Sequence, residues 1–538
     1  MKRKHLFLLA ITTGILLSLA WPEIGSMNFL LFIGFIPLLF VEEHIYQEIQ
    51  NGGKRKLLPY SYLAFLLFNA LTTWWVWNAS AFGGVAAIVC NALFMSVIFN
   101  LFHQVRLALG KIRGYFGLCV LWMGWEYVHL NWDLSWPWLT LGNGFATQYT
   151  WVQWYEYTGV FGGSLWILLV NILLFEAFKI YRTDTKKAFT SKAFITGIAF
   201  IALPIIWSLV KYNNFQDQGS PIDVVVIQPN IDPYNEKFGS SSPQQVMKMT
   251  KLAEQKMDNM VDYVVAPETA IPQSFDEAKF KHTSEFNILK LLINKYPQSK
   301  VIIGASSYSI YEPGAQHSET ARLARDQNFW YDFSNTAIQI DARDSVQFYH
   351  KSKLVPGVEK MPFPWLFQHF QDLAFNLGGT TGSLAGQENR QAFGNSEDSV
   401  RVAPIVCYES IYGDYVGDYI NEGDANVFFI ITNDGWWKDT PGYKQHMNYA
   451  RLRAIEHRKS IARSANTGIS CFINQKGDAS QETGWWVPAV IRQVIMVNNE
   501  KTFYTLYGDY FGRTSLVFGG FLLLYALSRR VKLNDLRR

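Results

Sequence analysis

The sequence predicts a multi-span α-helical membrane domain of about eight transmembrane helices, joined to an external α/β domain of about 300 residues. Three observations support this class. Only 17% of the 538 residues are charged and 49% are hydrophobic, whereas an ordinary soluble domain is roughly 25% charged. Apolar stretches long enough to cross a membrane recur before residue 212. Short β-rich runs alternate with helical patterns after it.

Residues 1–212 are predicted to form the transmembrane domain with about seven helices, and residues 506–538 add a last helix and a basic tail. The predicted spans are residues 6–20, 29–40, 63–77, 83–102, 115–128, 165–178, 194–210 and 516–527. The first stretch could instead be a cleaved signal peptide. No small-x-small cleavage site precedes Trp21, so we expect an uncleaved first span.

Loop charges predict the orientation of the spans. Lys and Arg gather before the first span, in every second loop and after the last span, whereas the alternate loops, including residues 129–163, contain none. Because basic residues are retained on the cytoplasmic side, this pattern places both termini in the cytoplasm. It places residues 211–513 outside, which for the inner membrane of a bacterium is the periplasm.

Residues 213–505 are predicted to form the external α/β domain, because strand and helix patterns interleave along this part of the chain. The predicted strands are residues 224–227, 263–265, 301–303, 336–340, 346–349, 402–407, 427–432, 469–473 and 494–497. The predicted helices are residues 243–260, 284–296 and 445–463.

Three of these strands end in side chains that can carry chemistry. Glu268 follows one strand, Lys351 follows a second, and Cys407 ends a third, with Glu409 two residues later. Each residue alone also fits a plainer interpretation: an exposed loop carboxylate, a solvated lysine or a small buried hydrophobe. A cysteine at a strand end before a turn can instead be a nucleophile with a stabilised thiolate.

Taken together, a Glu, a Lys and a Cys at successive strand ends resemble the triad of the nitrilase, or carbon–nitrogen hydrolase, superfamily. The resemblance implies a four-layer αββα sandwich. It also implies that Glu268 is the general base, Cys407 the nucleophile and Lys351 the cation that stabilises the oxyanion. Lys353 could replace Lys351 on sequence grounds alone, and the resemblance selects Lys351.

A multi-span region before this domain and one span after it are similar to the membrane-integrated branch of the superfamily, the apolipoprotein N-acyltransferases. Motifs that resemble this branch lie at residues 136–143, 226–231, 433–437, 445–458 and 463–468. The resemblance implies supporting and substrate-binding roles for further residues. The supporting residues are Glu359, Tyr408 and Glu409, and the substrate-binding residues are Phe238, Trp436 and Trp437.

Two positions depart from the family pattern. The chain reads Pro356-Gly357-Val358-Glu359 where the family has Pro-Phe-Gly-Glu. It has Phe238 where relatives carry a tryptophan.

The resemblance implies a two-step acyl transfer that needs no cofactor. Cys407 attacks an ester of a membrane phospholipid, by resemblance at sn-1 of phosphatidylethanolamine, and forms a thioester and a lysophospholipid. The α-amino group of the diacylglyceryl-cysteine of an apolipoprotein then takes the acyl chain, which is the last step of lipoprotein maturation. The expected partners are therefore these two substrates and the bilayer.

Other classes of partner lack support in the sequence. The four cysteines form no CxxC and no pairing with histidine at metal spacing, so no metal site is expected. A net charge of +4 does not indicate nucleic-acid binding. Nothing in the sequence demands more than a monomer.

Two other functions remain compatible with parts of the sequence. A membrane-tethered amidase of the same superfamily would pass the acyl group to water rather than to a lipoprotein amine. A transporter or receptor would use the external domain for binding alone, although broken helices with paired polar residues in mid-membrane are not evident.

Overall fold

The computed structural model describes residues 1–237, 239–324, 329–363, 383–395 and 397–535, with the side chains of 531–535 left out. The described residues form two compact units. One contains Met1–Trp77, Ala81–Asn214 and Tyr507–Arg538, and the other contains Asn78–Ser80 and Phe215–Leu506.

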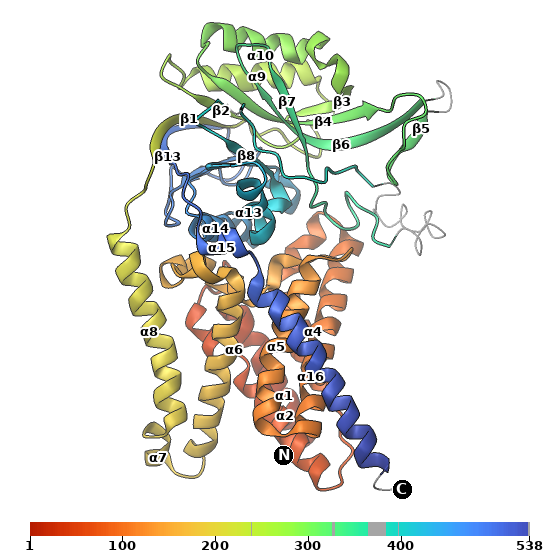
Figure 1. Cartoon of the computed structure of the whole chain (residues 1–538), viewed down its shortest axis with the longest axis vertical. Helices are drawn as coiled ribbons and strands as arrows, with labels where there is room; N and C mark the ends of the chain where they lie inside the picture. The colour runs from red at the N-terminus through yellow and green to blue at the C-terminus, as the bar shows by residue number, and fades with distance from the viewer. Residues whose placement is uncertain (238, 325–328, 364–382, 396, 536–538) are drawn as a thin grey trace. The chain divides into compact units, whose positions relative to one another are not determined.

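The first unit is helical, and every predicted span overlaps its helical segments, although the span predicted at residues 29–40 is interrupted between Phe32 and Ile36 (Figure 1). Its helices are α1 (Arg3–Ala20), α2 (Ile36–Gln50), α3 (Leu58–Thr73), α4 (Ala81–Leu109), α5 (Lys111–Leu130), α6 (Tyr155–Tyr181), α7 (Thr185–Phe189), α8 (Lys192–Asn214) and α16 (Tyr510–Asp535). Six segments among the described residues are long and apolar enough to cross a membrane, namely α1, α4, α6, α8, Asn28–Gln50 and Tyr510–Arg530. The predicted multi-span helical class is confirmed, although α3 and α5 are not among these six.

Buried polar side chains join the helices of this unit. Between the short helix η1 (Asn28–Phe32) and α2, the chain breaks its helical hydrogen bonds, and Asn171 of α6 replaces two of them. Asn171 Nδ2 donates to the Leu31 carbonyl at 2.7 Å, and the Phe35 N–H donates to Asn171 Oδ1 at 2.9 Å. Backbone groups at membrane depth need such partners because lipid offers none.

The second unit contains two β-sheets. The larger sheet has the order β13-β1-β2-β4-β6-β5, with β3 paired to β4 and β7 paired to β6. Its strands are β1 (Ser220–Gln228), β2 (Tyr263–Val265), β3 (Ile271–Asp276), β4 (Lys300–Ile310), β5 (Arg322–Ala324), β6 (Phe329–Ile340), β7 (Val346–His350) and β13 (Ala489–Val497). The smaller sheet has the order β12-β11-β10-β9-β8. Its strands are β8 (Val402–Val406), β9 (Val427–Thr432), β10 (Ile461–Ala465), β11 (Cys471–Ile473) and β12 (Ala479–Ser480).

Helices cover the outer face of each sheet, and the inner faces of the sheets meet. Helices α9 (Ser242–Glu254) and α10 (Ser284–Lys295) lie on the larger sheet, and α13 (Gly413–Asn421) and α14 (Pro441–His457) lie on the smaller one (Figure 1). Between the sheets, the Tyr263 and Phe429 rings pack edge to face with centroids 5.3 Å apart. The layers confirm the predicted αββα sandwich.

Burial on both faces explains why the inner strands look like continuous apolar runs. Every residue of β8, β9 and β10 is buried, as expected for parallel strands covered on both sides. Strand β1 is buried in the same way over its last five residues.

The structure corrects two predicted helices. The helix expected over residues 243–260 ends at Glu254. The helix expected over residues 445–463 covers Pro441–His457 instead, and residues 461–463 belong to β10. Arg458 ends this helix because it adopts a left-handed backbone conformation, with φ of 50°. Strand β10 follows only a few residues later, where it pairs with β9 and β11.

Candidate active site

The three predicted catalytic residues lie close together in the sandwich. Glu268 follows β2, Lys351 follows β7, and Cys407 begins the short helix η7 (Cys407–Ile411) after β8. The Lys351 Nζ donates to Glu268 Oε1 at 3.1 Å. The Cys407 thiol interacts electrostatically with both the carboxylate and the ammonium.

A close backbone approach positions Glu268. The Gly304 N–H of β4 donates to the Pro267 carbonyl at 3.1 Å. A Cβ atom added to Gly304 would lie 2.6 Å from the Glu268 Cα, so only glycine fits at this position. Glycine in β4 therefore lets the end of β2 bend towards the site.

The turn at Cys407 carries backbone strain. Its φ is 50°, in the left-handed region that non-glycine residues rarely adopt. Such strain is typical of functional turns, where the surrounding structure holds one side chain in place. Here the Cys407 carbonyl accepts a hydrogen bond from Ser410 Oγ at 2.7 Å, and His446 Nε2 lies 3.2 Å from the same oxygen.

Glu409, one of the predicted supporting residues, links the lysine and cysteine strands. Its fully buried carboxylate accepts hydrogen bonds from the backbone N–H of Ser352 and of Val406, each at 2.8 Å. Because Ser352 follows Lys351 and Val406 precedes Cys407, this carboxylate fixes the spacing of the two reactive groups.

Glu359, the second predicted supporting carboxylate, contacts Lys351 directly. The Lys351 Nζ donates to Glu359 Oε1 at 2.9 Å, and the Val355 N–H donates to Glu359 Oε2 at 2.9 Å. In the loop that departs from the family pattern, Gly357 takes a φ of 79°, a left-handed conformation that glycine adopts without strain.

The remaining predicted residues lie around this centre. Trp436 packs edge to face on Tyr234 with ring centroids 5.3 Å apart, and Trp437 packs on His446 at 5.5 Å. Tyr408 is buried with its ring 5.3 Å from that of Tyr412. Phe238 lies outside the described residues.

Two asparagines of the site were not predicted. Asn335 Nδ2, from β6, donates to Glu268 Oε1 at 2.8 Å and to Glu359 Oε1 at 3.0 Å. The Asn433 N–H donates to Glu268 Oε2 at 3.1 Å. The polar run 334–336 inside an otherwise apolar strand was a signal for Asn335. For Asn433, the only signal was that residues 433–437 resemble a motif of the family.

The charges of the site are set by burial and by its ion pairs. Burial raises the pKa of Glu268, but Lys351, Asn335 and Lys237 outweigh burial and hold this pKa below its usual value. Burial lowers the pKa of Lys351, but Glu268 and Glu359 outweigh burial and raise it well above its usual value. Burial and the Glu268 charge raise the pKa of the Cys407 thiol. The resting site therefore contains a carboxylate, an ammonium and a protonated thiol.

A buried salt bridge supports the loop that carries Asn433. Asp434 accepts from Arg463 Nη2 at 2.7 Å, and its other oxygen lies 3.0 Å from His446 Nδ1. Burial raises the pKa of Asp434, but Arg463 and His446 lower it to about 2. Among the described residues, no cluster of His, Cys, Asp and Glu could hold a metal ion.

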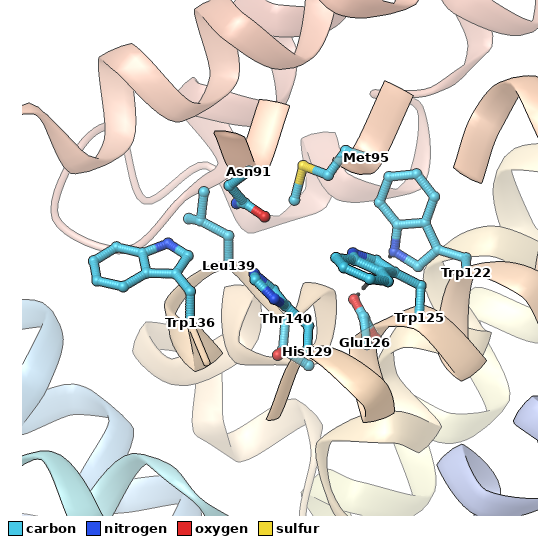
Figure 2. Close-up of a pocket in the computed structure, with 9 residues that line it drawn as sticks. All are labelled: Asn91, Met95, Trp122, Trp125, Glu126, His129, Trp136, Leu139 and Thr140. Atoms are coloured by element: carbon cyan, nitrogen blue, oxygen red, sulfur yellow. Dashed lines mark hydrogen bonds between the residues drawn. The ribbon is translucent and has the colours of Figure 1, made fainter. Parts of the chain in front are cut away.

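The helical unit contains a separate small polar cavity of about 10 Å³ (Figure 2). The cavity is lined by Asn91, Met95, Trp122, Trp125, Glu126, His129, Trp136, Leu139 and Thr140. Glu126 Oε1 accepts from Trp122 Nε1 at 3.1 Å and from the Leu141 N–H at 2.8 Å.

Four buried polar atoms of this lining have no hydrogen-bond partner among the residues that the structure describes. They are Asn91 Oδ1, Glu126 Oε2, His129 Nε2 and Trp136 Nε1. Trp132 Nε1 donates to His129 Nδ1 at 2.8 Å, which leaves the proton of a neutral imidazole on Nε2. The lining thus offers indole and imidazole donors beside amide and carboxyl oxygens.

Comparison with known families agrees with this geometry. The family model for the carbon–nitrogen hydrolases matches residues 224–498. The chain belongs to the carbon–nitrogen hydrolase family. Residues 13–173 match a second model, the N-terminal domain of apolipoprotein N-acyltransferase.

Relatives match over nearly the full chain. An apolipoprotein N-acyltransferase from Chlorobaculum tepidum is 29% identical, with 97% of each chain covered. Another from Geobacter metallireducens is 25% identical, covering 94% of this chain and 92% of the relative. The similar solved structures include a carbon–nitrogen hydrolase superfamily protein from Xanthomonas campestris, 14% identical with a TM-score of 0.33, covering 51% of this chain and 91% of that one. The family matches and the two relatives confirm the predicted family and enzyme class, an acyltransferase.

Proposed function

We propose that this chain moves a fatty acyl group from a membrane phospholipid to the α-amino group of an N-terminal diacylglyceryl-cysteine in a lipoprotein. The charge pattern of the buried site carries this proposal: an ionised Glu268 beside a protonated Cys407 and the Lys351 ammonium. This pattern suits a thiol that ionises only when a base takes its proton. The matched relatives, named for the same transfer, support the choice of acceptor.

The first step forms an acyl-enzyme. Glu268 takes the proton of the Cys407 thiol, and the thiolate attacks the ester carbonyl of the phospholipid. The Lys351 ammonium stabilises the oxyanion, a contribution worth about 3 kcal/mol for one well-placed donor. The ester C–O bond then breaks, the proton passes from Glu268 to the leaving oxygen, and a lysophospholipid departs.

The second step transfers the acyl chain to nitrogen. The neutral α-amino group of the lipoprotein attacks the thioester, and Glu268 takes a proton from this nitrogen. The C–S bond breaks, the proton returns to sulfur, and an amide remains. Because the first product leaves before the acceptor reacts, the kinetics are ping-pong.

The donor and the location belong to the same proposal. Phosphatidylethanolamine at sn-1 is the proposed donor, and the inner membrane of a bacterium is the proposed site of action. The alternating loop charges support a periplasmic position for the catalytic unit, since basic loops stay in the cytoplasm.

The test is intact-mass spectrometry of the full chain, purified in detergent and incubated with phosphatidylethanolamine. We expect the native chain to gain the mass of one fatty acyl group, which neutral hydroxylamine removes. Cys407→Ala should gain nothing. Cys471→Ala, which changes a buried cysteine of the same unit, should still be acylated.

Three results would contradict the proposal. Acylation of Cys407→Ala would place the intermediate elsewhere. The absence of any adduct on folded native chain, with several phospholipids supplied, would exclude the first step. Ammonia release from small amides without lysophospholipid would favour an amidase instead.

A further inference from the structure

Lys237 is a buried lysine beside the active site that no motif of the sequence indicated. Its side chain is only 3% exposed, although lysine is almost never buried without a compensating charge. Its backbone is held on both sides. The Lys237 N–H donates to the Asp232 carbonyl at 2.9 Å, and Gln245 Nε2 donates to the Lys237 carbonyl at 2.7 Å.

The loop that carries Lys237 is tied to the catalytic base through two asparagines. The Ile231 N–H donates to Asn466 Oδ1 at 3.2 Å, and Asn466 Nδ2 donates to Asn433 Oδ1 at 3.1 Å. The Asn433 N–H in turn donates to Glu268. The position of this loop is therefore coupled to that of the base.

The Lys237 ammonium interacts electrostatically with two reactive groups, the Glu268 carboxylate and the Cys407 thiol. The Glu268 carboxylate forms its ion pair with Lys351 rather than with Lys237. Burial lowers its pKa to about 8, although Glu268 and Cys407 partly oppose this. Its charge thus acts on the site without being neutralised by a carboxylate of its own.

Lys351 alone does not balance the two carboxylates that it contacts. Lys351 is shared by two carboxylates, Glu268 and Glu359. These three groups alone sum to one negative charge in a buried site. Moving a proton from Cys407 to Glu268 leaves this sum unchanged but puts the negative charge on sulfur. With Lys237 included, the same four groups and the thiol sum to zero before and after the proton moves.

We propose that Lys237 is the second cation of the active site, which balances the carboxylates around Lys351 and stabilises the Cys407 thiolate. It is a positioning residue, because it acts on the nucleophile through its charge. The inference rests on the proposed function for the roles of Cys407 and Glu268. The other charged group facing the thiol is Asp434, which is already paired with Arg463 and His446.

The test measures thiolate formation directly. The full chain in detergent is treated with iodoacetamide at about pH 7, below the pKa of the Lys237 ammonium, and alkylation of the Cys407 peptide is followed by mass spectrometry. We expect Lys237→Met to slow this alkylation about tenfold, which corresponds to a thiol pKa about one unit higher. Lys237→Arg keeps the charge and should retain the native rate.

A matched control and a compensating variant sharpen the test. Lys248→Met removes an exposed lysine from α9, whose side chain is 44% exposed, and should leave the rate of alkylation unchanged. Adding Glu359→Gln to Lys237→Met removes one negative charge as well and should return the rate towards the native value. If Lys237→Met does not fold, Lys237→Gln carries the same expectation.

Two results would overturn the inference. One is a native rate of Cys407 alkylation in folded Lys237→Met or Lys237→Gln. The other is an equal loss in Lys237→Met and Lys237→Arg, which would indicate packing rather than charge. Alkylation needs no phospholipid, so a failure of the acyl-transfer proposal would leave this result intact and distinguishable.

Discussion

Glu409 illustrates how single side chains build this site. Besides the two backbone N–H groups of the lysine and cysteine strands, its carboxylate accepts from the hydroxyls of Tyr349 at 2.8 Å, Tyr415 at 2.6 Å and Tyr419 at 3.2 Å. Every partner is a donor, so this position requires a group that only accepts hydrogen bonds.

We therefore expect Glu409→Gln to impair acyl-enzyme formation, although this substitution conserves the shape of the side chain. Its amide NH₂ would face a donor on one side, which leaves buried polar groups unpaired at about 1–3 kcal/mol each. Acyl-enzyme formation, measured by intact mass after short incubations, should fall by about 100-fold. Glu388→Gln, at an exposed position, is the control, and equal rates in both variants would contradict the argument.

The depressed pKa of Asp434 predicts a pH-dependent stability. A carboxyl group with a pKa of about 2 in the folded chain and an ordinary value of 3.8 contributes about 2 kcal/mol. The contribution is complete above about pH 4 and is lost as the pH falls through 2. The midpoint of thermal unfolding in detergent should therefore fall more steeply between pH 4 and pH 2 for the native chain than for Asp434→Asn. The same dependence of the unfolding midpoint on pH in the two chains would exclude this contribution.

At the scale of elements, the end of α5 and the segment after it are held by polar contacts around the small cavity of Figure 2. Its volume of about 10 Å³ matches one water molecule. Donors at His129 and Trp136 and acceptors at Asn91 and Glu126 complement the four hydrogen bonds of a water. A water bound there would bridge α4 and α5 by hydrogen bonds.

An ordered water is accordingly expected at this place in an experimental structure of the helical unit. Trp136→Phe removes the indole N–H donor and keeps an aromatic ring at this position. It should lower the free energy of unfolding in detergent by about 1 kcal/mol. Trp74→Phe changes a tryptophan that is 47% exposed and should have no effect. An empty cavity in a well-resolved map would refute the expectation.

At the scale of the whole molecule, the loop charges predict one orientation in the membrane. A green fluorescent protein fused after Arg538 should fluoresce, because the C-terminus is expected in the cytoplasm. Alkaline phosphatase fused after Gln218 should be active, because this reporter folds only outside. The opposite pair of results would reverse the topology and place the site in the cytoplasm.

Much of the architecture could be predicted because it depends on local properties of the chain. The length of an apolar run is local, so each predicted span overlaps helical segments, with one interruption in the span at residues 29–40. Burial on both faces makes β8 and β9 visible as apolar runs. The prediction of a helix through residues 461–463 was wrong, because the parallel pairing of β10 with β9 joins strands on either side of α14 and is not a local property of the sequence.

The sequence by itself determined the membrane class, the α/β class and, through the family resemblance, the three residues proposed for catalysis. Only the tertiary structure decided which groups surround them: Asn335 and Asn433 on the base, Glu409 between the lysine and cysteine strands, and Lys237 as a buried cation. These partners come from strands and loops far apart along the chain. Their meeting depends on strand register and loop path, and the energies of buried charges depend on that meeting.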